Sequence, residues 1–148
     1  MPVNPDLAGR TFPPTAPYLV GREKVREFAR AVFSESPLSL DVAAARAAGY
    51  PDLVAPPTFA VVIQQASLDG LLADPEAGFA IEQVVHGEQR FAYTRPIVAG
   101  DELRGTLSVT SLRSAGGHSM LTADTVITDA DGETVVVATS TLVVRGEE

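Results

Sequence analysis

A long apolar helical segment followed by strand-like segments is the feature that most restricts how this chain can fold. Residues 59–72 carry apolar side chains on nearly every side of a predicted helix, which is typical of a buried helix. After residues 74–75 the apolar side chains alternate with polar ones, as they do in half-buried β-strands. This second pattern predicts four strands, at residues 81–93, 102–114, 119–129 and 134–144.

Turn residues join the predicted strands into an antiparallel meander. Gly116-Gly117 and Asp131-Gly132 are typical of tight hairpins between neighbouring strands. Helices that come first and a meander that follows indicate an α+β fold. The apolar helix and the sheet can each cover the other's apolar surface if the sheet curls around the helix, which is the hot-dog arrangement. An antiparallel sheet wrapped around one central buried helix still has an open edge, and a second subunit commonly covers it.

The residues upstream of the long helix predict two further helices. Apolar side chains at helical spacing predict a helix over residues 22–33. Asp41 is suited to cap a second helix over residues 42–48, because its carboxylate can accept a hydrogen bond from a free backbone N–H group. Residues 34–40 are expected to form a loop, and Thr58 is expected to cap the long helix.

Size and composition limit the classes of function. A chain of 148 residues is expected to form a single domain, residues 1–148, with an irregular lead-in at residues 1–16. A formal net charge of -8 argues against a nucleic-acid partner. With no cysteine and only two widely separated histidines, neither a metal site nor a cofactor is expected. The lack of a long apolar run and of a leader pattern predicts no membrane contact and a cytoplasmic location.

Several short motifs occur in an order and spacing that resemble one known family. Ser34-Glu35-Ser36-Pro37-Leu38-Ser39, Ala45, Gly49-Tyr50 and Pro56-Pro57-Thr58-Phe59-Ala60 follow the layout of MaoC-like hydratase and dehydratase domains. In catalytic members that stretch reads D-x-N-P-[LIV]-H, a small residue, G-[FY] and P-I-x-H-G. The segment from Arg95 to Leu103 resembles the family's P-[IV]-x-x-G-D-x-L motif, and His86-Gly87-Glu88-Gln89 resembles a signature of its N-terminal-type domains. The similarity implies a relation to substrate-stabilising subunits of bacterial (3R)-hydroxyacyl-ACP dehydratases.

The same resemblance implies that the catalytic pair is absent. In catalytic members the Asp and the His act as an acid/base pair that removes a proton beside the thioester and helps water to leave. Ser34 stands at the Asp position and Ser39 at the His position. A serine hydroxyl without a neighbouring base cannot act as a general base near neutral pH. Phe59-Ala60 likewise replaces the family's H-G, and the bulky Phe59 is expected to crowd the approach of the thioester.

We therefore expect an acyl-thioester-binding subunit that depends on a catalytic MaoC-like hot-dog partner in a heterodimer. The ligand implied is acyl-ACP or acyl-CoA. The residues predicted to bind it are those of the long helix and its entry, together with one strand residue: Pro57, Thr58, Phe59, Val62, Ile63, Ala66 and His86.

Two alternatives remain open at this point. One is a homodimeric module that binds acyl thioesters without turnover. The other is a self-sufficient dehydratase in which His86 and Glu88 replace the lost pair, because strand alternation places both side chains on one face. A structural role for His86 competes with this second alternative.

Other polar residues near the motifs also have two interpretations each. Arg90 and Arg95 are expected on the outward face of their strand, although either could meet a phosphate of the pantetheine arm. Gln64, Gln65 and Asp69 on the long helix are expected to line a pocket or subunit contact, or to face solvent.

Overall fold

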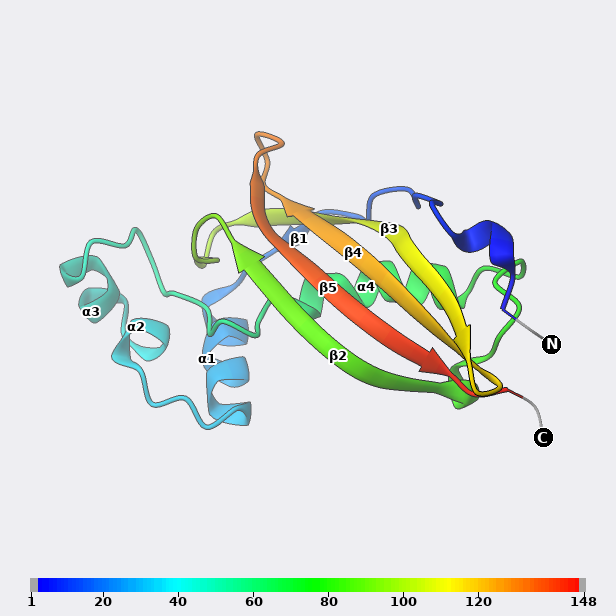
Figure 1. The fold of residues 1–148 in the computed structure, drawn as a ribbon. Helices are drawn as coiled ribbons and strands as arrows, with labels where there is room; N and C mark the ends of the chain where they lie inside the picture. The colour runs from blue at the N-terminus through cyan, green and yellow to red at the C-terminus, as the bar shows by residue number, and fades with distance from the viewer. Residues whose placement is uncertain (1–2, 147–148) are drawn as a thin grey trace.

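A five-stranded antiparallel sheet curls around one helix, α4, in the computed structural model, which describes residues 3–146 (Figure 1). The strand order is β1-β3-β4-β5-β2. Helices α1 to α3 gather at one end of the sheet (Figure 1). The elements are η1 Pro5–Leu7, β1 Tyr18–Leu19, α1 Arg22–Ala31, α2 Pro37–Leu40, α3 Val42–Ala47, α4 Val61–Leu72, η2 Ile81–Gln83, β2 Val84–Tyr93, β3 Glu102–Ala115, β4 His118–Thr128 and β5 Thr134–Val144. The predicted hot-dog arrangement is confirmed.

The strands follow the predicted alternation of buried and exposed side chains. On β3, Leu103, Gly105, Leu107 and Val109 are buried against the helix side, while the residues that alternate with them are more exposed. At the hairpin between β3 and β4, Gly116 and Gly117 have φ values of 59° and 81°. A tight hairpin turn with two positive φ values favours glycine at both positions, so the sequence signal is confirmed.

Helix α4 begins later and is less enclosed than the sequence predicts. Residues 57–60 form turns with i→i+3 hydrogen bonds, so the helix starts at Val61, and the expected cap at Thr58 is wrong. Its sheet side is buried, but Gln65, Ala66 and Asp69 on the other side are exposed. The prediction of a helix buried all round was therefore wrong for one face within this single chain.

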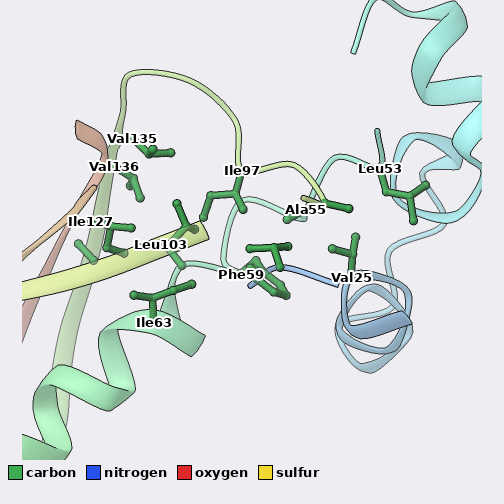
Figure 2. Packing of buried hydrophobic residues seen from close by; sticks show 14 residues of the cluster. Val25, Leu53, Ala55, Phe59, Ile63, Ile97, Leu103, Ile127, Val135 and Val136 are labelled. Carbon is green, nitrogen blue, oxygen red and sulfur yellow. The ribbon is translucent and has the colours of Figure 1, made fainter. Parts of the chain in front are cut away.

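The core consists of two apolar clusters with a polar layer between them. Ile63, Ile127 and Ala138 belong to one cluster, which Figure 2 shows in part, and Leu68 and Leu142 belong to the other. On α4, β4 and β5 alike, the residues between the two clusters are polar and buried: Gln64, Ser67, Thr125 and Ser140. Each element therefore passes from one apolar cluster through the polar layer to the other.

Hydrogen bonds satisfy the polar layer. The Gln64 side-chain amide donates to Ser140 Oγ, which in turn donates to Gln89 Oε1 at 2.8 Å. Ser67 Oγ and Thr125 Oγ1 lie 3.0 Å apart as a second hydrogen-bonded pair. Because buried polar groups are costly when they lack partners, this layer fixes how α4 seats on the sheet.

Two segments differ from their predicted conformation. Residues 37–40 of the expected loop form the short helix α2, in which Pro37 occupies the first turn, where its missing N–H group costs nothing. The predicted strand over residues 81–93 begins only at Val84, because Ile81–Gln83 form a 3-10 turn. Asp41, in contrast, caps α3 as predicted by accepting a hydrogen bond from the Ala43 N–H at 3.0 Å.

The two edges of the sheet differ in how they are covered. The N-terminal segment hydrogen-bonds along β3: the N–H groups of Gly9, Phe12 and Thr15 donate to β3 carbonyl groups at 2.8–2.9 Å. The expected irregular lead-in thus contains the short helix Pro5–Leu7 and covers most of this edge. At the other edge, the ten-residue strand β2 pairs with β5 alone among the residues that the structure describes. None of the helices between residues 3 and 146 combines the length and apolarity that crossing a bilayer requires.

Candidate functional site

A cavity of about 450 Å³ lies where the helical end of the molecule meets the end of β2. Its wall combines residues of the α1–α2 connection and α2, of the segment that leads into α4, and of the segment after β2. They are Ser34, Ser36, Leu38, Ser39, Val54, Ala55, Pro56, Pro57, Tyr93, Thr94, Arg95, Pro96 and Ile97. The lining is mainly apolar, with hydroxyl groups as its most frequent polar groups.

Ser34 and Ser39 both line this cavity, so the fold brings together the two positions that sequence reasoning singled out. Ser39 is only 4% exposed, and its Oγ donates to the Val54 carbonyl oxygen at 2.6 Å. That hydrogen bond ties α2 to the segment before α4. None of the described lining residues is an aspartate, a glutamate or a histidine, so neither serine has a base beside it in the wall.

Arg95 is the charged side chain of the described lining. Its guanidinium donates to Asp101 at 2.8 Å and 3.1 Å and also lies 3.4 Å from an Asp129 carboxylate oxygen. The hydrogen bond to Asp101 is the main cause that raises the Arg95 pKa further above its usual value. With two carboxylates around one guanidinium, the cavity wall offers no free positive charge there. Arg95 lies just after β2 and not on the strand, so its expected place on the outward face of the strand was wrong. Arg90 lies on β2, is exposed as expected, and pairs with Glu88 at 3.1 Å.

Tyr93, the last residue of β2, is a site residue that the sequence did not reveal. Its hydroxyl donates to the Pro57 carbonyl oxygen in the turn before α4, and its ring forms part of the cavity wall. Burial raises the Tyr93 pKa to about 12, although a hydrogen bond from the Ala60 N–H acts in the opposite direction. The contact joins residues far apart in the chain, and no local pattern signals it.

The predicted ligand-binding residues do not all lie at the cavity. Pro57 lines it, and the neighbouring Thr58 is exposed. Phe59, labelled in Figure 2, is fully buried. It packs edge-to-face on Phe28, with ring centroids 5.3 Å apart, and does not line the cavity, so the expectation that it crowds the approach was wrong.

Residues of α4 itself lie on two different faces. Ile63 is buried toward the sheet (Figure 2), whereas Ala66 is exposed on the opposite face and Val62 is half-buried. The other polar residues of this exposed face interact with each other, since the Gln65 amide donates to Asp69 Oδ1 at 2.8 Å. Gln64 instead belongs to the buried layer described above.

His86 and Glu88 do not form the predicted pair on one face. The strand register shifts between them, as in a β-bulge at Gly87, and His86 lies opposite Leu142 while Glu88 lies opposite Thr141. Cross-strand partners share a face, and Leu142 is buried while Thr141 is not. The two side chains therefore leave opposite faces of the sheet, so the prediction from simple alternation was wrong. Both residues are exposed, and neither lines the cavity.

No group of three or more His, Asp or Glu side chains within the described part of the chain is placed to hold a metal ion. The arrangement at the cavity can bind a neutral, partly apolar molecule through hydroxyl groups and apolar contacts. It has no group in the described wall that could remove a proton near neutral pH.

Comparison with known proteins gives consistent matches over almost the whole chain. Residues 6–138 match the family model "FAS1-like, dehydratase domain region". The chain is similar to the UPF0336 protein Lxx02810 of Leifsonia xyli, with 64% identity over 148 residues that span 100% of this chain and 99% of that protein.

Two solved structures are also similar in sequence and fold. One is the C-terminally truncated HadBC (3R-hydroxyacyl-ACP dehydratase) complex from Mycobacterium tuberculosis, at 33% identity and a TM-score of 0.84, covering 95% of this chain and 99% of that chain. The other is a MaoC-like dehydratase, at 38% identity and a TM-score of 0.85, where the match covers 94% of this chain and 42% of the longer one.

Proposed function

Since the chain belongs to the FAS1-like dehydratase-domain family, with its MaoC-like hot-dog fold, we propose that it is a substrate-binding subunit of a (3R)-hydroxyacyl thioester dehydratase. It binds an acyl-ACP or acyl-CoA thioester but does not supply the catalytic acid/base pair. A partner hot-dog chain that carries the D-x-N-P-x-H motif supplies that pair.

The observation that carries this proposal is a cavity of suitable size whose described wall lacks a base. Ser34 and Ser39 lie at the wall, where the resemblance expects the acid/base pair, and Ser39 already donates its hydroxyl hydrogen to a backbone carbonyl. A general base contributes about 10²–10⁴-fold to such a reaction. A chain without one binds the thioester but leaves proton transfer to another subunit.

The character of the wall supports a neutral ligand. The hydroxyl groups of Ser34, Ser36 and Thr94 can exchange hydrogen bonds with amide or thioester groups, and Pro57 and Ile97 supply apolar surface. Arg95, already shared by two carboxylates, offers little to a phosphate group. The neutral pantetheine and thioester part of an acyl carrier suits this wall better than its charged end does.

The open edge of the sheet supports a partner subunit. β2 exposes a ten-residue row of backbone groups on one side, while the N-terminal segment covers most of the opposite edge. An uncovered edge of this length is a ready template for another strand. A partner at β2 would lie beside His86, which then serves as a contact residue and not as a base.

The predicted binding residues divide into two groups in this proposal. Pro57 belongs to the wall of the cavity, with the exposed Thr58 next to it in the chain, and Phe59 and Ile63 support the start of α4 from the core. Val62 and Ala66, on the face of α4 that the sheet does not cover, line the path of the acyl tail once the partner encloses it.

Hydration of trans-2-enoyl-CoA, followed by the loss of absorbance, tests the proposal. The protein is assayed alone and then mixed with a D-x-N-P-x-H hot-dog chain from the same genome. Activity that requires both chains, above that of the partner alone, is the expected result. Turnover by this chain alone that disappears in His86→Ala, but persists in the control His118→Ala, would contradict it. Binding without any turnover in the mixture would favour the homodimeric binding module instead.

A further inference from the structure

The backbone of Phe33 is held in a conformation that phenylalanine rarely adopts. Its φ of 59° makes it the one residue other than glycine with a positive φ in the part of the chain that the structure describes. Phe33 ends helix α1: its N–H donates to the Arg30 carbonyl oxygen at 3.1 Å, and the next N–H, of Ser34, donates to the Ala29 carbonyl oxygen at 2.8 Å. Glycine usually occupies this position of such a helix end, because a Cβ atom raises the free energy of the left-handed backbone.

The Phe33 side chain gains no packing within the chain that would offset this cost. It is 91% exposed, and the neighbouring Val32 is 44% exposed. Strained residues cluster at sites that contact ligands, and a large apolar ring in water adds a second unfavourable contribution. A phenylalanine that is both strained and exposed therefore indicates a contact with a molecule outside this chain.

Phe33 lies at the edge of the cavity described above. The next residue, Ser34, lines the cavity, and so does Ser36 on the same connection between α1 and α2 (Figure 1). The peptide bond between Phe33 and Ser34 is trans, so their Cα atoms lie about 3.8 Å apart. Because the cavity wall suits the neutral arm of an acyl carrier, the charged end of the carrier lies outside the cavity, within reach of Phe33.

An unpaired cation lies beside this ring. Arg30, one helical turn before Phe33, is exposed and has no carboxylate partner between residues 3 and 146. The other cations of α1 are paired: Arg22 with Asp52, Lys24 with Glu27 and Arg26 with Glu23. Glu35, also exposed, follows two residues after Phe33, so the net charge around the ring is close to zero. The aromatic ring, more than the charge, therefore determines what binds here.

We propose that Phe33 and Arg30 bind the nucleotide end of an acyl-CoA, with the adenine ring stacked on Phe33 and a phosphate group paired with Arg30. The inference rests on the proposed function and deepens it by naming coenzyme A as the carrier. One exposed aromatic face and one free guanidinium are what a nucleotide needs. A stable protein–protein contact instead buries about 800 Å² on each partner, and the exposed large apolar side chains of this connection are Val32 and Phe33 alone.

Three probes that share one thioester test the inference by calorimetric titration. They are trans-2-butenoyl-CoA, the corresponding phosphopantetheine thioester, which lacks the nucleotide, and the pantetheine thioester, which also lacks the phosphate. Phe33→Gly should bind the CoA thioester about 5- to 150-fold more weakly and the other two unchanged, whereas Phe33→Tyr should retain the wild-type affinities. Arg30→Gln should weaken both phosphate-bearing probes by about two- to fivefold and leave the pantetheine thioester unchanged.

The stability of Phe33→Gly separates this role from a structural one. Because glycine accepts the left-handed backbone, the variant should match the wild-type Tm or exceed it by about 1–4 °C while it loses affinity for the CoA thioester. In proton NMR spectra, the adenine H2 and H8 signals of the CoA thioester should move upfield on binding to the wild type but not to Phe33→Gly. Leu19→Ala, which shortens an exposed apolar side chain on β1, is the matched control and should change no affinity.

The contradicting outcomes are distinct. Equal affinity of the wild type for the three probes would overturn the inference and leave the proposed function intact. An equal loss for all three probes in Phe33→Gly would also overturn it, by showing that the ring only supports the cavity wall. If Phe33→Gly weakened binding of an acyl-carrier-protein thioester but not of the CoA thioester, the surface would belong to a carrier protein instead. If no thioester bound, the proposed function itself would fail.

Discussion

The close approach of β3 to α4 at Gly105 allows a sharp prediction for the substitution Gly105→Ala. A methyl group at this position would lie 2.9 Å from Thr125 Cγ2 and 3.4 Å from Ile63 Cγ2. Thr125 is fully buried and Ile63 is 2% exposed, so neither side chain can move into solvent. Thr125 also belongs to the polar layer, since its hydroxyl pairs with Ser67, and a shift would strain that hydrogen bond.

The size of the effect follows from two opposing contributions. Overpacking a dense core costs about 1–3 kcal/mol. Replacing glycine by alanine also reduces the entropy of the unfolded chain, which returns about 0.4–1 kcal/mol. Because the added methyl group meets two buried side chains, the middle of each range applies and the net loss is about 1–2 kcal/mol; for a domain of this size each kcal/mol lowers the Tm by about 2–4 °C. Gly105→Ala should therefore melt about 2–8 °C below the wild type.

Gly70→Ala is the matched control for this measurement. Gly70 lies on the exposed face of α4, and an added methyl group there would meet nothing within 4 Å outside the helix itself. Alanine favours a helix over glycine by about 1 kcal/mol, so this variant should melt about 2–4 °C above the wild type. Thermal unfolding followed by circular dichroism compares the three proteins. A Gly105→Ala variant that is as stable as the wild type would refute the packing of α4 on β3 described above.

Three further predictions concern single groups. Ser140→Ala removes the acceptor of the buried Gln64 amide and should lower the free energy of unfolding by about 1–3 kcal/mol. In urea denaturation the midpoint should fall while the slope stays the same. An unchanged midpoint would show that the polar layer contributes nothing to stability. The Tyr93 pKa of about 12 lies above the value of about 10 for a tyrosine in an unfolded chain, because burial favours the neutral phenol. The stability that this difference contributes is fully present below pH 10 and is lost as the pH rises from 10 toward 12. Ultraviolet titration should show one late-ionising tyrosine, absent in Tyr93→Phe. The hydrogen bond from Arg22 lowers the Asp52 pKa, so this contribution is present above pH about 4 and lost as the pH falls below it. Asp52→Asn should thus lower the urea midpoint at pH 7 but leave it unchanged well below pH 4, where Asp52 is protonated in both states. An equal fall of the midpoint at both pH values would contradict this.

The sheet was the most predictable part of the fold. Two-residue alternation and glycine turns identified all four long strands, and Thr134–Val144 has the predicted bounds. Strand periodicity depends on which face is buried, and the sequence records that directly. Helix boundaries were less predictable, because Phe59 and Ala60 continue the apolar pattern of the helix but lie in a turn whose Pro57 carbonyl accepts a hydrogen bond from Tyr93.

The candidate site was predictable only for those of its residues that lie close together in the sequence. Motif spacing identified Ser34 and Ser39, and both line the same cavity. Two other features depend on contacts between distant residues. The bulge at Gly87 separates His86 from Glu88, and a single glycine in a strand only suggests such a bulge. Tyr93 reaches the start of α4 only after β2 has paired with β5, which no local pattern reveals.

The central claim is that the base belongs to a partner and not to this chain. The most direct measurement is trans-2-enoyl-CoA hydration by the mixed complex after the Asp and the His of the partner's D-x-N-P-x-H motif are replaced by Asn and Gln. We predict that the hydration rate falls by about 10²–10⁴-fold or more while the complex still forms, because the described wall of this chain's cavity contains no base that could replace the lost pair. A complex that keeps its rate after these replacements would contradict the account and would place the acid/base group in this chain.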